Sequence, residues 1–419
     1  MDEPTRPLDG LERRALLPIA HEYMLAGMVV NRALLPQVVM RGAGLDGLNQ
    51  VAIDLWMGAS PVYTHRLRAL MGIEGDTVEA IMKALQLDVG FVHQYMSVAY
   101  AITDDRHGEF WLEHCGALLD AEPHGEPHVV GMCHTIEDPT FDATALATNP
   151  RARIRPIHRP PRVPSDRHPH CHWTITIDPD NEPVGPAALT EQVAALPLSH
   201  VTNPPAPGGG GMSDYRDAFR PDFRLGDLAT DTLAAVAREF LVQTHLLVAA
   251  GELASRVHFD EATSRAITRS AWIGTAWITS ERLGALVEGS PRERVARVLA
   301  LTPAIPPGFA RTVATGDEAD GDTVTLTLVP ERADLLDAAH PGCPGLLASG
   351  EVAPFAAMVH AIERRAAVAV TVHPDRVEVV VGLDPSTATA PEPDEVALMR
   401  IGMVTGWRFH VEDRLAPSA

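Results

Sequence analysis

The chain carries the same pattern twice, and this duplication constrains its fold more than any other feature. Short motifs recur in one order at a nearly constant offset, which indicates a duplicated structural unit. At offsets of 216 to 218 the matching segments are Ala20–Leu25 with Ala237–Val242, Trp56–Gly58 with Trp272–Gly274, Arg66–Leu70 with Arg282–Leu286, Gly90-Phe91 with Gly308-Phe309, and Ala117–Ala121 with Asp334–Ala338. A sixth pair, Met132–Glu137 with Met358–Glu363, has an offset of 226.

The matches predict two repeats, roughly 15–182 and 228–415, joined by a connecting segment. We therefore divide the chain into a first repeat (1–182), a linker (183–227) and a second repeat (228–419). The linker contains Asn203–Gly211, a run of proline, alanine and glycine whose composition is typical of interdomain connections.

The hydrophobic periodicity changes in the same order within each repeat. Apolar residues first recur at helical spacing and then alternate with polar ones, as strands require. The expected helices are 16–39, 48–71 and 76–87, then 228–257, 260–288 and 291–301; the expected strands are 92–103, 108–113, 151–158 and 172–177, then 323–329 and a hairpin over 368–381. The pattern predicts an α+β protein whose repeats are related by a pseudo-twofold axis, each with a helical block followed by a mostly antiparallel sheet.

Histidine and cysteine are concentrated in the first repeat. Nine of the nineteen histidines lie between His107 and His172, together with three of the four cysteines. They form the groups His114-Cys115, Cys133-His134 and His168-Pro169-His170-Cys171-His172. Imidazole and thiolate together suit zinc first, with iron or copper as alternatives.

The second repeat provides an internal comparison, because most of these groups are missing from it. Carrying the offsets through places His114-Cys115 opposite Glu331-Arg332, Cys133 opposite Val359 and Asp138 opposite Arg364, while His134 and Glu137 keep His360 and Glu363. Matching the strand that ends at Asp178 with one ending at Asp413 would place His170-Cys171-His172 opposite Thr405-Gly406-Trp407. If these residues served only packing, both repeats would keep similar residues at the matched positions. The asymmetry therefore predicts an active first repeat and a structural second one.

The candidate metal site draws on residues far apart in the sequence. His168, His170 and His172 alternate, so on a strand they share one face and Cys171 lies on the other. The candidate ligands are His114, Cys115, Cys133, His134, His168, His170, Cys171 and His172. Glu113, Glu137 and Asp138 are candidates for a general base beside a metal-bound water, or for a group that orients a ligand histidine.

The order of helices, a strand leading into Trp111–Cys115, a second cysteine at Met132–His134 and a third before His172–Ile177 resembles the aminothiazoline-carboxylate hydrolase-like proteins. More loosely, it resembles 4-vinyl-reductase-type domains. The likeness covers Leu16 to Asp178, although Pro169-His170 stands where Gly-Asp is expected before the last cysteine. It implies metal-assisted opening of a small ring or cleavage of a C–N bond, with Cys115, Cys133 and Cys171 at the family's cysteine positions.

These observations favour a metal-dependent enzyme that acts on a small-molecule substrate, with zinc-type hydrolysis first. Two alternatives are a non-haem iron oxidoreductase using His134, Glu137 and His170, and a small-molecule binding protein with a structural metal. The net charge of −21 disfavours nucleic acid and anionic membranes as partners. No signal peptide or membrane span is expected, so the chain is predicted to be cytoplasmic. Alternating apolar residues near an edge of the second repeat permit a homodimer.

Overall fold

The computed structural model describes residues 6–204, 208, 210–316 and 322–410 and confirms the α+β class. The elements of the first repeat are α1 (Arg13–Val38), α2 (Gly44–Met71), α3 (Val78–Leu85), β1 (Met96–Asp104), β2 (His107–Cys115), α4 (Gly116–Ala121), α5 (Glu126–Val130), α6 (Glu137–Leu146), β3 (Ala152–His158) and β4 (Cys171–Ile177). Those of the second are α8 (Thr230–Ser255), α9 (Glu261–Gly284), α10 (Pro291–Leu301), β5 (Phe309–Thr315), β6 (Thr323–Pro330), α11 (Cys343–Ala348), α12 (Ala353–His360), β7 (Ala366–Val372), β8 (Val377–Leu383) and α13 (Asp394–Met399).

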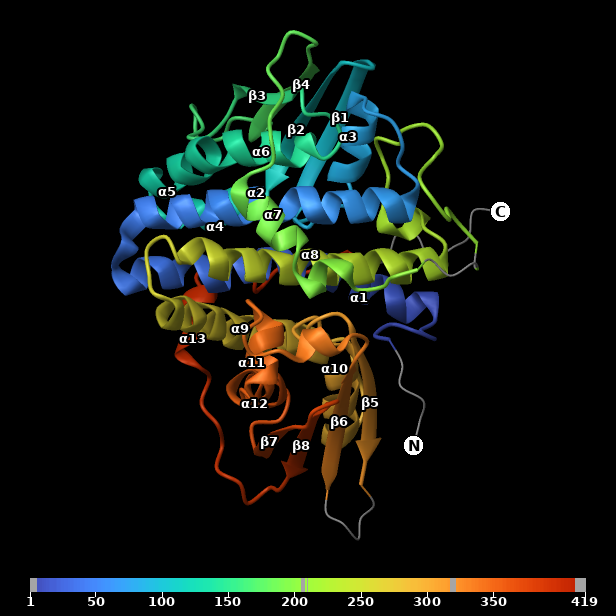
Figure 1. Cartoon of the computed structure of the whole chain (residues 1–419), viewed down its shortest axis with the longest axis vertical. Coiled ribbons are helices and arrows are strands. Elements are labelled where there is room, and N and C mark those ends of the chain that lie inside the picture. Colours follow the sequence, from blue (N-terminus) through green and yellow to red (C-terminus); the bar gives the residue numbers. More distant parts are fainter. Residues whose placement is uncertain (1–5, 205–207, 209, 317–321, 411–419) are drawn as a thin grey trace.

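The two antiparallel sheets have the same topology. The first sheet runs β1-β2-β4-β3 and the second runs β5-β6-β8-β7, so each repeat is built to one plan. The long helices α1, α2, α8 and α9 are stacked in the middle of the molecule, and the sheets lie at its two ends (Figure 1). This arrangement agrees with two repeats related by a pseudo-twofold axis.

Two reciprocal ion pairs join the central helices. Arg66 of α2 donates to both carboxylate oxygens of Glu239 on α8, at 3.0 and 2.6 Å. Arg282 of α9 donates in the same way to Glu22 on α1, at 2.6 and 2.9 Å. Both residues of one pair match those of the other in the duplicated sequence. The repeats therefore meet through a self-complementary contact, as in a twofold dimer.

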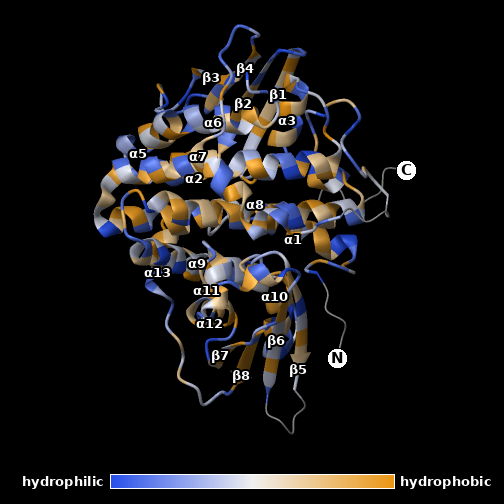
Figure 2. Ribbon diagram, in the orientation of Figure 1, coloured by the Kyte–Doolittle hydropathy of each residue, from blue (hydrophilic) through white to orange (hydrophobic). Residues whose placement is uncertain are grey.

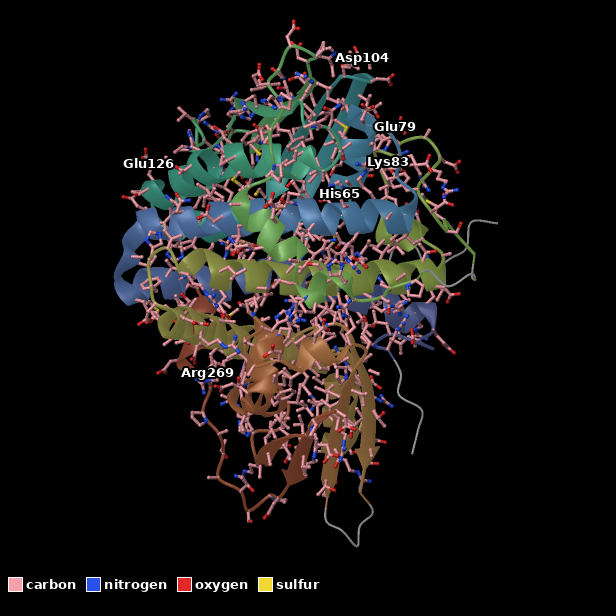
Figure 3. All side chains as sticks on the ribbon, viewed as in Figure 1. His65, Glu79, Lys83, Asp104, Glu126 and Arg269 are labelled. Carbon is pink, nitrogen blue, oxygen red and sulfur yellow. The ribbon has the colours of Figure 1, made fainter. Side chains whose placement is uncertain are left out.

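One hydrophobic core extends through both repeats. Helix α8 packs against α1 and α2, and α1 also packs against α9. Apolar residues recur along the central helices and the strands, and side chains fill the spaces between the layers (Figures 2 and 3). The repeats consequently do not have separate cores, because the buried cluster includes residues from every one of these helices.

The connection between the repeats is folded against them over its described part. It contains α7 (Ala188–Ala194), which packs on α2. Tyr215 is fully buried, and its backbone N–H donates to the Met71 carbonyl at 2.7 Å. This segment thus contributes to the packing of the helical layer.

Two helical stretches are long and apolar enough to cross a membrane, where the sequence analysis expected none: Arg13–Met71 and Thr230–Ser255. In the first stretch 72% of the most apolar 18-residue window is buried inside the protein, and in the second stretch 100% is buried. Core helices meet the same criterion, so these stretches are only weak evidence for a membrane span.

Candidate functional site

A cavity of about 140 Å³ lies in the first repeat, between α1, α2, α6 and the helix-covered face of the first sheet. Its wall is mostly apolar. The apolar residues are Met28, Leu35, Ala52, Trp56, Phe91, Met96, Leu112, Ala117, Met132, Ile136, Phe141 and Trp173, and the polar ones include Asn31, Arg32, Asp88, Cys115, Glu137 and Cys171. Enclosed apolar cavities with a few polar groups are the usual form of small-molecule sites.

A β-bulge turns Cys115 toward this cavity. Ser97 pairs with His114 and Val98 pairs with Leu112, so Glu113 is an extra residue in β2. After Leu112 the bulge reverses the side of the sheet that each successive side chain faces. Leu112 and Cys115 are therefore both buried on the cavity side. Cys115 also caps α4, because its sulfur accepts a hydrogen bond from the Leu118 N–H at 3.4 Å.

The other two cysteines approach from β4 and from a π-helix. Cys171 pairs with Leu112 across the sheet and lines the cavity. Cys133 lies in the π-helical turn Gly131–Ile136 directly before α6 and is 3% exposed. Such turns are rare and frequently occur at functional sites.

The three thiols and Glu137 form one electrostatically connected group. Burial raises the pKa of Cys115 to about 12 and raises the pKa values of Cys133 and Cys171 well above their ordinary value. The Glu137 carboxyl contributes to the rise in pKa of all three thiols. The thiols are therefore protonated at neutral pH and are poor nucleophiles as they stand.

Glu137 is the unusual member of this group. It lies at the start of α6, and its carboxyl oxygen Oε2 is buried without a hydrogen-bond partner among the described residues. Burial raises the pKa of Glu137 to about 8, although the Arg159 guanidinium opposes the rise. The carboxyl therefore holds its proton at neutral pH but can release it at little cost.

The histidines are not gathered with these thiols. His172 lies on the face of β4 opposite Cys171, where its Nε2 is 2.8 Å from a carboxylate oxygen of Glu109. The His170 ring lies 5.2 Å from that of His168 and 5.9 Å from that of His114, measured between ring centroids. Alternation along β4 separates Cys171 from His172.

One ring nitrogen of His170 and one of His134 already have hydrogen-bond partners. His170 Nδ1 accepts a hydrogen bond from the Cys115 backbone N–H at 3.2 Å. His134 Nε2 donates to the Pro160 carbonyl at 2.7 Å. The set of His134, Glu137 and His170 suggested for iron does not form a metal-binding group among the described residues. Within 6–204, 208, 210–316 and 322–410, no three His, Cys, Asp or Glu side chains form a group that could hold a metal ion.

Two of the three proposed bases lie outside the cavity wall. Glu113 is exposed at the bulge and accepts a hydrogen bond from Trp111 Nε1 at 2.9 Å. Asp138 forms an ion pair with Arg159 at 2.5 Å. Of the three, Glu137 alone lines the cavity.

The structure also revises one correspondence between the repeats. Strand β4 matches β8 in topology, and Cys171 pairs with Leu112 as Val377 pairs with Leu328. The expected match of His170–His172 with Thr405–Trp407 is therefore wrong, since the latter segment follows α13 and lies outside the second sheet. The position of Cys171 is occupied by valine in the second repeat.

The sequence analysis did not predict a charged network that begins at Arg32 in the cavity wall. Arg32 of α1 forms an ion pair with Asp120 at 2.8 Å, and Tyr95 donates to the same carboxylate at 2.5 Å. The backbone N–H of Met403, which follows α13, donates to Asp120 as well. The signal available for this network was Arg32, a charged residue in the mostly apolar stretch Tyr23–Leu35 of α1.

Comparison with protein-family models, curated proteins and solved structures finds no match to this chain.

Proposed function

We propose that this protein is an enzyme that acts on a small, uncharged, largely apolar molecule in the first-repeat cavity, with Glu137 as proton donor and acceptor. The observation that carries the proposal is the buried, unpartnered carboxyl oxygen of Glu137 in the wall of that cavity. An unpaired buried carboxyl destabilises a fold by about 1–3 kcal/mol or more. A catalytic role explains why such a group is present.

The charges around the cavity support an uncharged substrate. Arg32 is neutralised by Asp120, while the Asp88 carboxylate accepts hydrogen bonds from the Tyr63 hydroxyl at 3.1 and 3.2 Å. Binding a charged molecule would require breaking one of these buried interactions. Aromatic side chains such as Trp56 and Phe141 provide contact area for an apolar ring.

The reaction we propose is hydrolysis of a C–N bond or a small ring, as the family resemblance implies. Ionised Glu137 would accept a proton from a water molecule while the water oxygen attacks the electrophilic carbon. As the C–N bond breaks, the same carboxyl would return that proton to the leaving nitrogen. One group can serve both steps when its pKa lies near the working pH.

A metal-dependent form of this reaction is the second candidate. The mutual electrostatic influence of Cys115, Cys133 and Cys171 favours it, because three thiols converge from three elements. Thiolates suit zinc, and bound zinc would lower the pKa of a water molecule. The thiols would have to lose their protons and shift position to bind the ion.

Ring opening of a panel of small uncharged lactams, thiazolines and oxazolines, followed by mass spectrometry, tests the proposal. We expect at least one compound to gain a water with the wild-type protein, and Glu137→Gln to slow this reaction by a factor of about 100 or more. Asp138→Asn is the matched control and should retain activity. Full activity of Glu137→Gln, or no reaction with any compound, contradicts the proposal. Activity that survives complete chelation excludes the zinc form.

A further inference from the structure

A second cavity, of about 250 Å³, adjoins the first and has a different chemical character. The two cavities share Phe91 and Met96 as lining residues. The second is lined by polar groups of α1, of the segment before β1, and of the connection between the repeats. Its ionisable groups are His21, His93, Tyr100, Asp222 and Arg224.

Two imidazoles present hydrogen-bond acceptors to this cavity. His21 Nδ1 donates to the Leu17 carbonyl at 3.0 Å, and His93 Nε2 donates to the Gln86 carbonyl at 2.7 Å. Burial lowers the pKa of His21 and lowers that of His93 to about 4, so both rings are neutral at pH 7. A neutral ring with one nitrogen protonated keeps a lone pair on the other.

The second nitrogen of each ring is open to the cavity. His21 is 6% exposed, and within the described part of the chain neither His21 Nε2 nor His93 Nδ1 makes a hydrogen bond. Neither atom belongs to the buried polar atoms that lack a partner, so both are accessible from the cavity. The site therefore offers two acceptors suited to a ligand that donates N–H or O–H.

The rim of the cavity carries one charge of each sign. Asp222 and Arg224 are exposed residues two positions apart that both line it. Neither forms an ion pair with another residue that the structure describes. A guanidinium beside an aspartate suits a molecule with a carboxylate and an ammonium group.

An equivalent cavity of about 270 Å³ lies between the second repeat, the N-terminal segment and the linker, and its polar groups pair with protein partners. Arg238 takes the position of His21 and donates to Asn203 at 2.9 Å and Asp9 at 2.8 Å. Glu331 accepts hydrogen bonds from the backbone N–H and hydroxyl of Thr202 at 2.7 and 2.9 Å. In the first cavity Gln94 is also paired, with the His410 backbone at 3.2 and 2.7 Å, but the second ring nitrogens of His21 and His93 have no such partner within the described ranges. Because the corresponding Arg238 is paired internally, these remaining acceptors indicate that a ligand completes the first cavity.

We propose that the cavity around His21 and His93 binds a small α-amino acid. Its carboxylate pairs with Arg224, and its ammonium group donates to the two imidazole nitrogens and to Asp222. This site is separate from the cavity that holds Glu137, and the proposal does not depend on the function assigned to that cavity.

Calorimetric titration of the full chain with L-alanine, L-lactate and propionate tests the ligand class. These three compounds have similar size and differ in an ammonium, a hydroxyl or no donor on the α-carbon. We expect alanine to bind at least about tenfold more tightly than propionate, with lactate between them. Equal affinity for alanine and propionate overturns the proposal, and so does the absence of alanine binding.

The position of the site is tested with Arg224→Ala. Both Arg224 and the control Arg216 are exposed arginines of the connecting segment, and Arg216 lies outside the cavity. We expect Arg224→Ala to weaken alanine binding by a factor of about ten or more, and Arg216→Ala to leave it unchanged. Equal effects of the two variants overturn the assignment. Glu137→Gln should bind alanine like the wild-type protein, which separates this test from that of the proposed enzyme.

Discussion

Replacement of Glu137 by glutamine should change how the stability of the protein depends on pH. Burial raises the pKa of Glu137 from 4.5 to about 8, so between these pH values the folded chain keeps a proton that the unfolded chain releases. Stability therefore falls as pH rises through this range. The glutamine variant has no proton to release at this position and avoids the loss.

The size of this effect follows from the pKa. Each pH unit corresponds to about 1.4 kcal/mol, and the difference between 4.5 and about 8 amounts to about 5 kcal/mol. Relative to wild type, Glu137→Gln should thus gain about 5 kcal/mol in free energy of unfolding between pH 4.5 and pH 8.5. Nearly all of this gain should occur below pH 8.

Urea unfolding at half-unit pH intervals in the presence of a chelator measures the difference. Glu113→Gln is the matched control, because it makes the same substitution at an exposed glutamate of the same repeat that lies outside the cavity. Parallel stability curves for wild type and Glu137→Gln would refute the reasoning. They would mean that the Glu137 carboxyl is hydrated or paired in solution, and the proposed catalytic role would lose its basis.

Three further predictions concern the charged contacts and the thiols. Arg66→Met should cost about 3–5 kcal/mol in urea unfolding, because it leaves the Glu239 carboxylate, 3% exposed, without its buried cation; a loss below 1 kcal/mol would contradict this. Asp120→Ala removes the acceptor and should speed hydrogen exchange of the Met403 amide, and an unchanged rate would show that the contact is not formed in solution. Iodoacetamide at pH 8 should modify Cys115 roughly a thousandfold more slowly in the native than in the urea-unfolded protein, since its pKa is about 12 and the ordinary value is 9.0; similar rates would contradict its burial.

The comparison of the two repeats supports the proposal that the chemistry lies in the first. The reciprocal ion pairs and the shared sheet topology are kept in both copies, as structural interactions should be. The groups around the two first-repeat cavities are not kept: Val377 replaces Cys171, and Arg238 with internal partners replaces His21. This difference fits the proposed division into one functional and one structural repeat.

The duplication, the α+β class and the approximate bounds of the long helices and of most strands could be predicted from the sequence, because periodicity is a local property. Most of the shorter helices and β5 (Phe309–Thr315) were not predicted. The helix expected at 291–301 forms as α10, and the hairpin expected over 368–381 forms as β7 and β8. The same local alternation correctly separates Cys171 from His172. Local pattern therefore determined the elements and the opposite faces of each strand.

Tertiary structure alone decided which face of the first sheet the helices cover. That choice brings Cys115, Cys133 and Cys171 to Glu137 and leaves His172 on the other side. The position of Cys115 also depends on the β-bulge at Glu113, which reverses the side of the sheet on which Cys115 lies. The alternation of polar and apolar residues in the sequence does not reveal this bulge. The sequence could not predict the charge state of Glu137 either, because the pKa of a carboxyl group depends on how many neighbouring atoms exclude water from it.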